Sequence, residues 1–261
     1  MNYPLYCPNP NDPANENLIR RLSDVPWIQT ISHPADQPFL IINDGCLGIA
    51  SADWPKVHPV VVDFLSGAAS FRREHGGGTG QLVAKAVGLK KRRDLSVWDA
   101  TAGLGRDAYV LASLGANVCL FERHPVVQAL LQDGLYRLSL SAEPALMEIY
   151  DRMTLVTEGM PSSANDVSVP PEVIYLDPMF PERSKSAKVK KEMALFHDLV
   201  GTDPDADDLL EPALDLAEYR VVVKRPKGAP ELAGRKPSLS LAGKSSRFDI
   251  YTRKAIPDAH T

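Results

Sequence analysis

Cysteine is scarce in this sequence, and long apolar runs are missing. Its 261 residues include three cysteines, which lie far apart and form no C-x-x-C pair, so neither a disulfide framework nor a zinc site is indicated. The six histidines pair with no potential co-ligand at a suitable spacing, and we expect no bound metal. No segment approaches the roughly 18 consecutive apolar residues of a membrane-spanning helix. The start, MNYPLYCPNPNDPANEN, lacks the features of a secretory signal, which predicts a cytoplasmic protein that contacts no membrane.

Excess positive charge is also missing, since the formal net charge is −4. This excludes a polycation that coats nucleic acid indiscriminately, so any such binding must reside in local clusters. Basic clusters occur at 90–93, 185–191 and 224–227. Such runs are most often solvent-exposed charged faces. Their position relative to other motifs has to decide whether they are that or nucleic-acid-binding clusters. The 44% hydrophobic content is ample for a packed core.

The N-terminal part of the chain predicts a small α+β domain over residues 1–75, followed by a larger domain over 76–261. The first 35 residues show no sustained period, and we expect loops and one short helix there. Two apolar runs flank Asn43-Asp44-Gly45 within 39–51, which is typical of a β-hairpin. With a third strand at 60–64, these runs predict a small antiparallel sheet. The glycine-rich segment 66–80 is either a linker or a functional loop.

The remainder alternates between strand and helix patterns, which is typical of a doubly wound, mostly parallel α/β sheet. A last segment, 247–254, is predicted to be an edge strand. Strands are predicted at 97–100, 117–122, 153–158, 173–178 and 220–226, and helices at 106–115, 125–140, 188–201 and 206–218.

The segment VWDATAGLGRDA, residues 97–108, joins the first of these strands to a helix through a turn of small residues. Glycine at 103 and 105 lets a ligand approach the backbone, and the helix start offers unpaired N–H groups. The spacing also satisfies the loose dinucleotide fingerprint G-x-G-x-x-G/A. A nucleotide-type cofactor is therefore indicated, but an NAD(P)-dependent oxidoreductase and a plain tight turn both stay open.

In an open parallel sheet the ligand lies beyond the carboxyl ends of the strands. That rule nominates the side chains that directly follow each predicted strand. Glu122 is placed to accept hydrogen bonds from the ribose hydroxyls of an adenosine-containing ligand. The other residues nominated in this way are Asp99, Arg123, Glu158, Gly159 and Asp177.

The strand VIYLDPMFP, residues 173–181, resembles the Asp/Asn-Pro-Pro-Tyr/Phe motif of methyltransferases that modify exocyclic or side-chain amide nitrogens. Asp177 and the backbone carbonyl of Pro178 can accept hydrogen bonds from an NH₂ group and orient it. Phe180 can stack on a base that has left its helix. Met179 stands where the usual motif has its second proline. The alternative is a common strand-ending turn with Phe180 in the core.

A basic run follows this motif directly, and a second one ends the next strand. Their position predicts phosphate contacts, which supply affinity and positioning without base specificity. A non-catalytic RNA-binding assembly factor is a further alternative. The residues nominated for RNA binding are Lys185, Lys188, Lys190, Lys191, Lys224 and Arg225.

Several blocks together resemble a known family. They are HGGGTG, DATAGLGRDA, FERHPVVQALLQDGL, YLDPMFPERSKSAKVKKEM, LVGTDPDADDLLEPA, RVVVKRP and RFDIY. Over roughly residues 58–252 the chain is similar to the bacterial small-subunit ribosomal RNA methyltransferase J family. The resemblance implies a Rossmann-like class I fold and transfer of a methyl group from S-adenosylmethionine to the exocyclic N2 amine of a guanine near the 3′ end of 16S ribosomal RNA. It leaves open whether naked RNA or the assembled subunit is the substrate, and which oligomeric state the protein adopts.

The same resemblance implies cofactor-binding positions. The pair after the glycine turn matches at Arg106 and Asp107, in addition to Gly103 and Gly105 of the turn itself. The resemblance also implies cofactor roles for Glu122, Arg123 and Asp177, and ungapped spacing places the adenine-contacting pair at Gly159 and Met160, with Glu158 beside it.

Overall fold

The computed structural model describes residues 2–53, 57–66, 77–161, 170–179, 191–201 and 203–258. Their contacts divide the chain into two compact units. The first comprises 1–63, 124–136 and 181–202, and the second comprises 64–123, 137–180 and 203–261. The predicted domain boundary between residues 75 and 76 lies outside the described residues, so that division stays a prediction. The first unit additionally takes in two segments from later in the chain.

The first unit contains a five-stranded sheet of order β2-β1-β3-β4-β5. The predicted hairpin is confirmed, and its turn residues Asp44 and Gly45 have φ of +50° and +70°, as a two-residue type I′ turn requires. The three predicted strands, β3, β4 and β5, pair antiparallel as expected. β1 and β2 were not predicted, and β1 runs parallel to both β2 and β3, so the sheet as a whole is mixed. The strands are β1 (Tyr3–Tyr6), β2 (Ile28–Ile31), β3 (Phe39–Asn43), β4 (Cys46–Ala50) and β5 (Val60–Val61).

Among the described residues, three helices contribute to this unit. The short helix expected near the N-terminus is α1 (Pro13–Leu22), which begins where the Asp12 side chain accepts a hydrogen bond from the N–H of Ala14. The first part of α5 (Pro125–Ser139) carries the buried Asp133, whose carboxylate accepts a hydrogen bond from the backbone N–H of Leu47 in β4. The third helix, α7 (Lys191–Val200), contacts β4 and β5.

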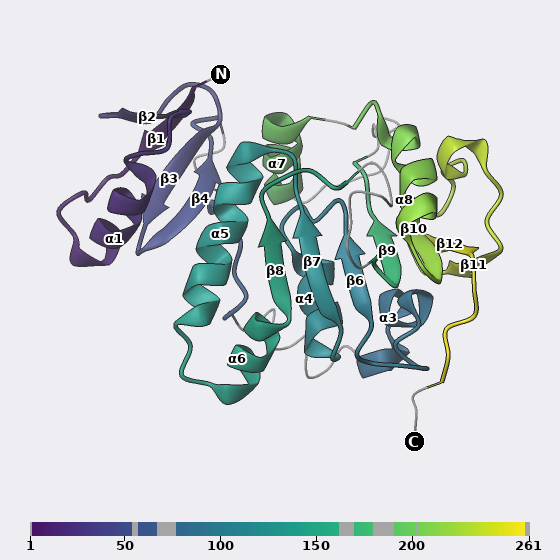
Figure 1. Ribbon diagram of the computed structural model, residues 1–261. Helices are drawn as coiled ribbons and strands as arrows, with labels where there is room; N and C mark the ends of the chain where they lie inside the picture. The colour runs from purple at the N-terminus through teal and green to yellow at the C-terminus, as the bar shows by residue number, and fades with distance from the viewer. Residues whose placement is uncertain are drawn as a thin grey trace. The chain divides into compact units, whose positions relative to one another are not determined.

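The second unit is built on a seven-stranded sheet of order β11-β12-β10-β9-β6-β7-β8 (Figure 1). The strands from β10 to β8 are parallel, whereas β12 and β11 are antiparallel additions. The segment predicted at 247–254 is a strand, β12, but it is not at the edge of the sheet, because β11 pairs along its outer side. The strands are β6 (Ser96–Asp99), β7 (Asn117–Phe121), β8 (Met153–Val156), β9 (Val173–Leu176), β10 (Arg220–Pro226), β11 (Leu239–Ala242) and β12 (Ser246–Thr252).

Helices pack on both faces of this sheet, as a doubly wound fold requires. Side chains alternate between the faces along a strand. Ile174 and Leu176 of β9 pack in a cluster with α8, whereas Tyr175 between them bonds to α4 on the other face. The helical segments of this unit are η1 (Gly78–Gly80), α3 (Leu82–Val87), α4 (Arg106–Ser113), α6 (Pro144–Asp151), η3 (Ala206–Leu209), α8 (Leu210–Leu216) and η4 (Leu232–Gly234).

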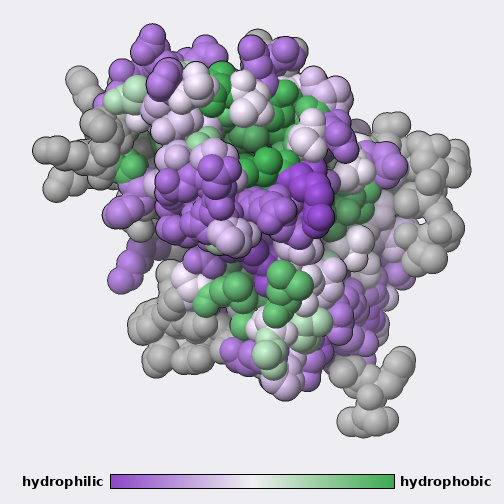
Figure 2. All heavy atoms as spheres, turned by 90° about the vertical axis from the view of Figure 1, so that its left-hand side faces the viewer, coloured by the Kyte–Doolittle hydropathy of each residue, from purple (hydrophilic) through white to green (hydrophobic). Residues whose placement is uncertain are grey.

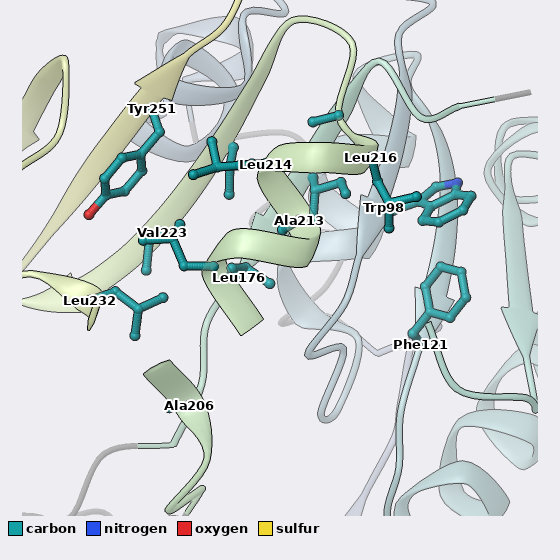
Figure 3. Packing of buried hydrophobic residues seen from close by; sticks show 14 residues of the cluster. Trp98, Phe121, Leu176, Ala206, Ala213, Leu214, Leu216, Val223, Leu232 and Tyr251 are labelled. Carbon is teal, nitrogen blue, oxygen red and sulfur yellow. The ribbon is translucent and has the colours of Figure 1, made fainter. Parts of the chain in front are cut away.

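The cluster beneath α8 fixes the ends of the central strands. Figure 3 shows Trp98 and Phe121 at one end of the cluster and Tyr251 at the other, with the α8 side chains between them. The rings of Trp98 and Phe121 lie with their centroids 4.9 Å apart. Each of these two residues is close to the end of its strand, so their packing holds the ends of β6 and β7 side by side.

Hydrophilic side chains predominate on the face shown in Figure 2, and apolar ones gather in separate patches. Among the described residues, the exposed large hydrophobic side chains are Leu65, Leu140 and Leu239. Single exposed leucines are normal on a protein surface. Within the described part of the chain, every helix is too short or too polar to cross a bilayer.

Candidate active site

The loops after β6, β7 and β9 meet at the carboxyl edge of the second sheet. β6 lies between β7 and β9. The chain leaves β6 toward β7 and β8 on one side and returns to β9 on the other, which makes this the topological switch point of the sheet. Asp99, Glu122 and Asp177 stand at or directly after these strand ends. The sequence-based expectation that strand ends bring these carboxylates to one edge is confirmed.

The turn after β6 is anchored to both neighbouring strands. The N–H of Ala100 donates to the carbonyl of Tyr175 at 3.0 Å, and the N–H of Ala102 donates to that of Phe121 at 3.0 Å. Gly103 donates its N–H to Oε2 of Glu122 at 3.0 Å. Gly103 and Gly105 have φ of +52° and +69°, which other residues rarely adopt. The atom nearest to a Cβ placed on Gly103 would be 3.9 Å away, so the turn is open to a ligand on that side.

Lys224 joins the two carboxylates nearest to the end of β9. Its Nζ lies 2.8 Å from Oδ2 of Asp177 and 3.0 Å from Oδ2 of Asp107. The hydroxyl of Tyr175 donates to the same Asp107 oxygen at 2.8 Å. The Asp177 backbone N–H donates to the Thr101 hydroxyl at 2.6 Å, which ties β9 to the glycine turn. Asp177 stays 37% exposed, so its carboxylate is both held and accessible.

Burial sets the protonation of these groups, and the charges around them adjust it. Burial raises the pKa of Asp177 above its ordinary value, while the Lys224 ammonium opposes that rise. Burial and the neighbouring Asp107 carboxylate raise the pKa of Asp99 well above its ordinary value. Burial lowers the pKa of Lys224, but the carboxylates of Asp177 and Asp107 outweigh it, and the net shift is upward. Lys224 therefore stays charged and favours the ionised form of Asp177.

A second group of ion pairs lies beside Met179, the residue after Pro178. Arg123 contacts Oδ1 of Asp203 through Nη2 and both oxygens of Asp205 through Nη1, the latter at 2.7 and 2.8 Å. Asp203 also accepts a hydrogen bond from the Met179 N–H through Oδ2 at 2.7 Å. The hydrogen bond to Asp205 raises the pKa of Arg123.

The residues expected to follow the third strand lie at the end of β8. Glu158 and Gly159 are exposed. Apart from its chain neighbours, no described residue has a heavy atom within 4 Å of a Cβ placed on Gly159. Met160 is partly buried against the cluster that contains Trp98 and Phe121. Arg106, at the start of α4, is exposed. Roles for these four residues in cofactor binding stay predictions.

Comparison with known proteins identifies the family. Residues 27–253 match the model of the family described as "Putative SAM-dependent methyltransferase". A relative from Colwellia psychrerythraea, named ribosomal RNA small subunit methyltransferase J, is 56% identical over 94% of this chain and 92% of its own. The chain belongs to the ribosomal RNA small subunit methyltransferase J family. A member from Shewanella amazonensis is 49% identical over 95% of this chain and 97% of its own.

A solved structure supports the assignment to this methyltransferase J family. The SAM-dependent methyltransferase from Neisseria gonorrhoeae is 38% identical, superposes with a TM-score of 0.71, and covers 95% of both chains. The class I fold and the dependence on S-adenosylmethionine expected from the sequence are therefore confirmed. The NAD(P)-dependent oxidoreductase is excluded, because the glycine turn that suggested it belongs to a methyltransferase.

The residues at this edge fit the cofactor of the methyltransferase J family. S-adenosylmethionine carries a sulfonium and an ammonium against one carboxylate, and its net positive charge suits an edge lined by Asp107, Glu122 and Asp177. The open side of Gly103 leaves room for close approach to the backbone. Glu122 is only partly buried, and through Oε2 it already orders the turn.

The structure changes the interpretation of the basic residues. Lys224 lies inside the acidic group rather than on a rim, and this corrects its assignment to phosphate binding. Arg225 is 2% exposed and donates from Nε and Nη2 to the Pro230 carbonyl at 2.9 and 2.5 Å. A guanidinium buried in this way is not placed to contact a phosphate, so its assignment is corrected too. Phe180, Lys185, Lys188, Lys190 and the side chain of Lys191 lie outside the described residues.

Sequence reasoning missed the link between Lys224 and Asp177, although a signal for it exists. β9 and β10 are parallel, with Leu176 opposite Val223. The next residues along the two strands are Asp177 and Lys224, which therefore emerge side by side on the same face. The register supplies this information, and the register is set by the sheet rather than by either segment alone. Asp203, from the block LVGTDPDADDLLEPA, was missed for a different reason: it lies in a loop, and its contact with Met179 depends on how that loop folds back.

Proposed function

We propose that this protein transfers a methyl group from S-adenosylmethionine to the exocyclic N2 amine of a guanine near the 3′ end of 16S ribosomal RNA. The names of the family members supply the RNA class. The observation that carries the choice of an amine is Asp177, an accessible carboxylate at the end of β9 that Lys224 holds through one oxygen. An accepting group fixed at this point suits a substrate N–H donor.

S-adenosylmethionine supplies the activated methyl group when it is bound. Asp177 and the Pro178 carbonyl accept hydrogen bonds from the two amine hydrogens, and so point the weak nitrogen lone pair along the transfer axis. The nitrogen becomes strongly acidic once it is alkylated, so its proton leaves to water without a dedicated base. The work of the protein is alignment, and no covalent intermediate with the chain is needed.

RNA binding is assigned to Lys185, Lys188, Lys190 and Lys191, with the N-terminal domain as an additional grip. The chain is acidic overall, so these lysines would supply local phosphate contacts beside the reaction site. Replacing Lys188 and Lys191 together with alanine should weaken RNA binding and reduce its dependence on salt concentration. If the salt dependence of RNA affinity is unchanged, these lysines belong to an ordinary solvent-exposed face that does not contact RNA.

The test supplies S-adenosylmethionine labelled in its methyl group to the purified protein with one of three substrates. These are naked small-subunit RNA, small subunits that lack the modification, and DNA. The products are digested, and the labelled nucleoside is identified. Label in N2-methylguanosine from either RNA substrate supports the proposal and shows which assembly state is recognised. Label in another nucleoside, or RNA binding without any transfer, contradicts it, and the latter result favours a non-catalytic assembly factor.

A further inference from the structure

The second proline of the usual Asp-Pro-Pro-Phe motif is replaced here by Met179, and this substitution changes what the backbone can do. Proline fixes φ and has no N–H, so a motif with two prolines is stiff without hydrogen bonds. Methionine lacks that stiffness but has a backbone N–H that can donate a hydrogen bond. In this protein the Met179 N–H donates to Oδ2 of Asp203 at 2.7 Å.

Asp203 forms two hydrogen bonds with the backbone of Met179. Besides accepting the Met179 N–H, it donates its own backbone N–H to the Met179 carbonyl at 3.1 Å. Two hydrogen bonds to one residue fix the position and the rotation of its backbone. One of them is charge-assisted and therefore stronger than a neutral bond.

The first of these bonds also aims the neighbouring carbonyl. The Met179 N–H and the Pro178 C=O belong to one planar trans peptide unit and point in opposite directions. Holding the N–H therefore directs the carbonyl away from Asp203. This is the carbonyl assigned above to the substrate amine, so Asp203 acts on the reaction through the backbone without touching the substrate.

Arg123 in turn fixes Asp203. The Asp203 side chain is 17% exposed, and Arg123 pairs with its Oδ1 while Oδ2 holds Met179. Arg123 directly follows Glu122 at the end of β7, and Asp205 holds the other arm of its guanidinium. The loop after β9 is thus tied to the strand two places away in the sheet, across β6.

We infer that Asp203 is a positioning residue for methyl transfer, clamping the Pro178–Met179 peptide in place of the missing proline, and that Arg123 serves this clamp. The inference rests on the proposed function, since it concerns the alignment of the same amine. It gives a role to the block LVGTDPDADDLLEPA and a positioning role to Arg123.

The test compares Asp203→Ala, Asp203→Asn and Arg123→Ala by single-turnover methyl transfer at saturating cofactor, with cofactor affinity measured by calorimetry. A misplaced acceptor should slow transfer by about a hundredfold in Asp203→Ala. Asparagine keeps an oxygen for Met179 but loses the charge, so about tenfold is expected. Arg123→Ala should also lose about tenfold, and adding it to Asp203→Ala should cost nothing more, because both act through one loop.

The matched control is Asp208→Ala, which removes the same charge from an exposed position in the same segment. It should transfer methyl at the wild-type rate, and all variants should bind the cofactor about as tightly as wild type. Wild-type transfer rates in Asp203→Ala would overturn the inference. A loss in Arg123→Ala that comes entirely from weaker cofactor binding would overturn the role given to Arg123.

Hydrogen exchange at the Met179 amide separates this inference from the proposed function. The clamp predicts protection of this amide in wild type and in Asp208→Ala, and loss of protection in Asp203→Ala. This readout needs no RNA. If wild type transfers no methyl group to RNA while the exchange result holds, the proposed function fails and the clamp stands. Equal exchange rates of the Met179 amide in wild type and Asp203→Ala would contradict the inferred role of Asp203.

Discussion

Two groups of ion pairs flank the loop after β9, and they differ in burial. In the inner group, Lys224 bridges Asp107 and Asp177 among largely buried neighbours. In the outer group, Arg123 and Asp205 are half exposed, and Asp203 alone is mostly covered. Charges interact strongly where water is excluded and weakly where it is not. The inner group therefore controls the ionisation of Asp177, whereas the outer group acts through the geometry of one peptide unit.

Replacing Lys224 should produce the largest effect among the residues that support Asp177. In Lys224→Met, Asp107 and Asp177 lose the cation between them, and we expect transfer to fall more than about a hundredfold. The free energy of unfolding should fall by about 2 kcal/mol, a value reduced for the partial exposure of the pair. Urea unfolding and single-turnover kinetics measure the two effects. Lys244→Met, an exposed lysine in the turn between β11 and β12, is the control and should change neither.

The pH dependence of the residual activity sharpens the comparison. Burial raises the pKa of Asp177 and Lys224 opposes the rise, so removing Lys224 raises that pKa further. The acid limb of the rate profile should therefore move to higher pH in Lys224→Met. In Asp203→Ala the limb should stay in place while the plateau falls, because the outer group does not contact the Asp177 carboxylate. A shift in both variants would erase the distinction between the two groups.

Asp99 offers a smaller test of the inner group, read from stability. Its folded-state pKa lies well above the unfolded value because of burial and the Asp107 carboxylate. Its contribution to stability is therefore complete below about pH 4 and is lost as pH rises toward the folded-state pKa. Asp99→Asn should flatten this decline and raise the urea midpoint at neutral pH. An unchanged pH dependence of unfolding in the variant would contradict a raised pKa for Asp99 in the folded protein.

The smallest effect is expected at Asp205, whose pair with Arg123 is open to solvent. The hydrogen bond from Arg123 lowers the pKa of Asp205, but exposed pairs contribute little and are screened by salt. Asp205→Ala should keep transfer within about twofold of wild type at low salt, and the difference should vanish at high salt. A tenfold loss that persists in high salt would place Asp205 with the inner group.

The sequence predicted the parallel centre of the fold because its strands are apolar segments separated by helical patterns. It did not predict β1, β2 and β11, with the segments YPLY, IQTI and LSLA. Length does not explain the difference, because β6, β8 and β9 also have four residues. Segments like these become strands by pairing with a neighbour. Because β11 was not predicted, β12 was predicted to lie at the edge of the sheet.

The site was predictable where position along a strand was enough. Asp177, Glu122 and the glycine turn follow from the rule about strand ends. Lys224 and Arg225 did not follow, because adjacent residues on a strand point to opposite faces and the sequence does not say which face is which. Lys224 pairs with the Asp177 carboxylate, and Arg225 is buried against the Pro230 carbonyl.

The most direct test of the account is the single-turnover rate of Asp177→Ala on the RNA substrate at saturating S-adenosylmethionine, measured together with cofactor affinity. Removing a preorganised group that acts on the transition state should cost about a thousandfold in rate, while the protein stays folded. A rate within tenfold of wild type would contradict the assignment of Asp177 to the substrate amine. A loss explained by failure to bind the cofactor would make Asp177 a cofactor residue alone.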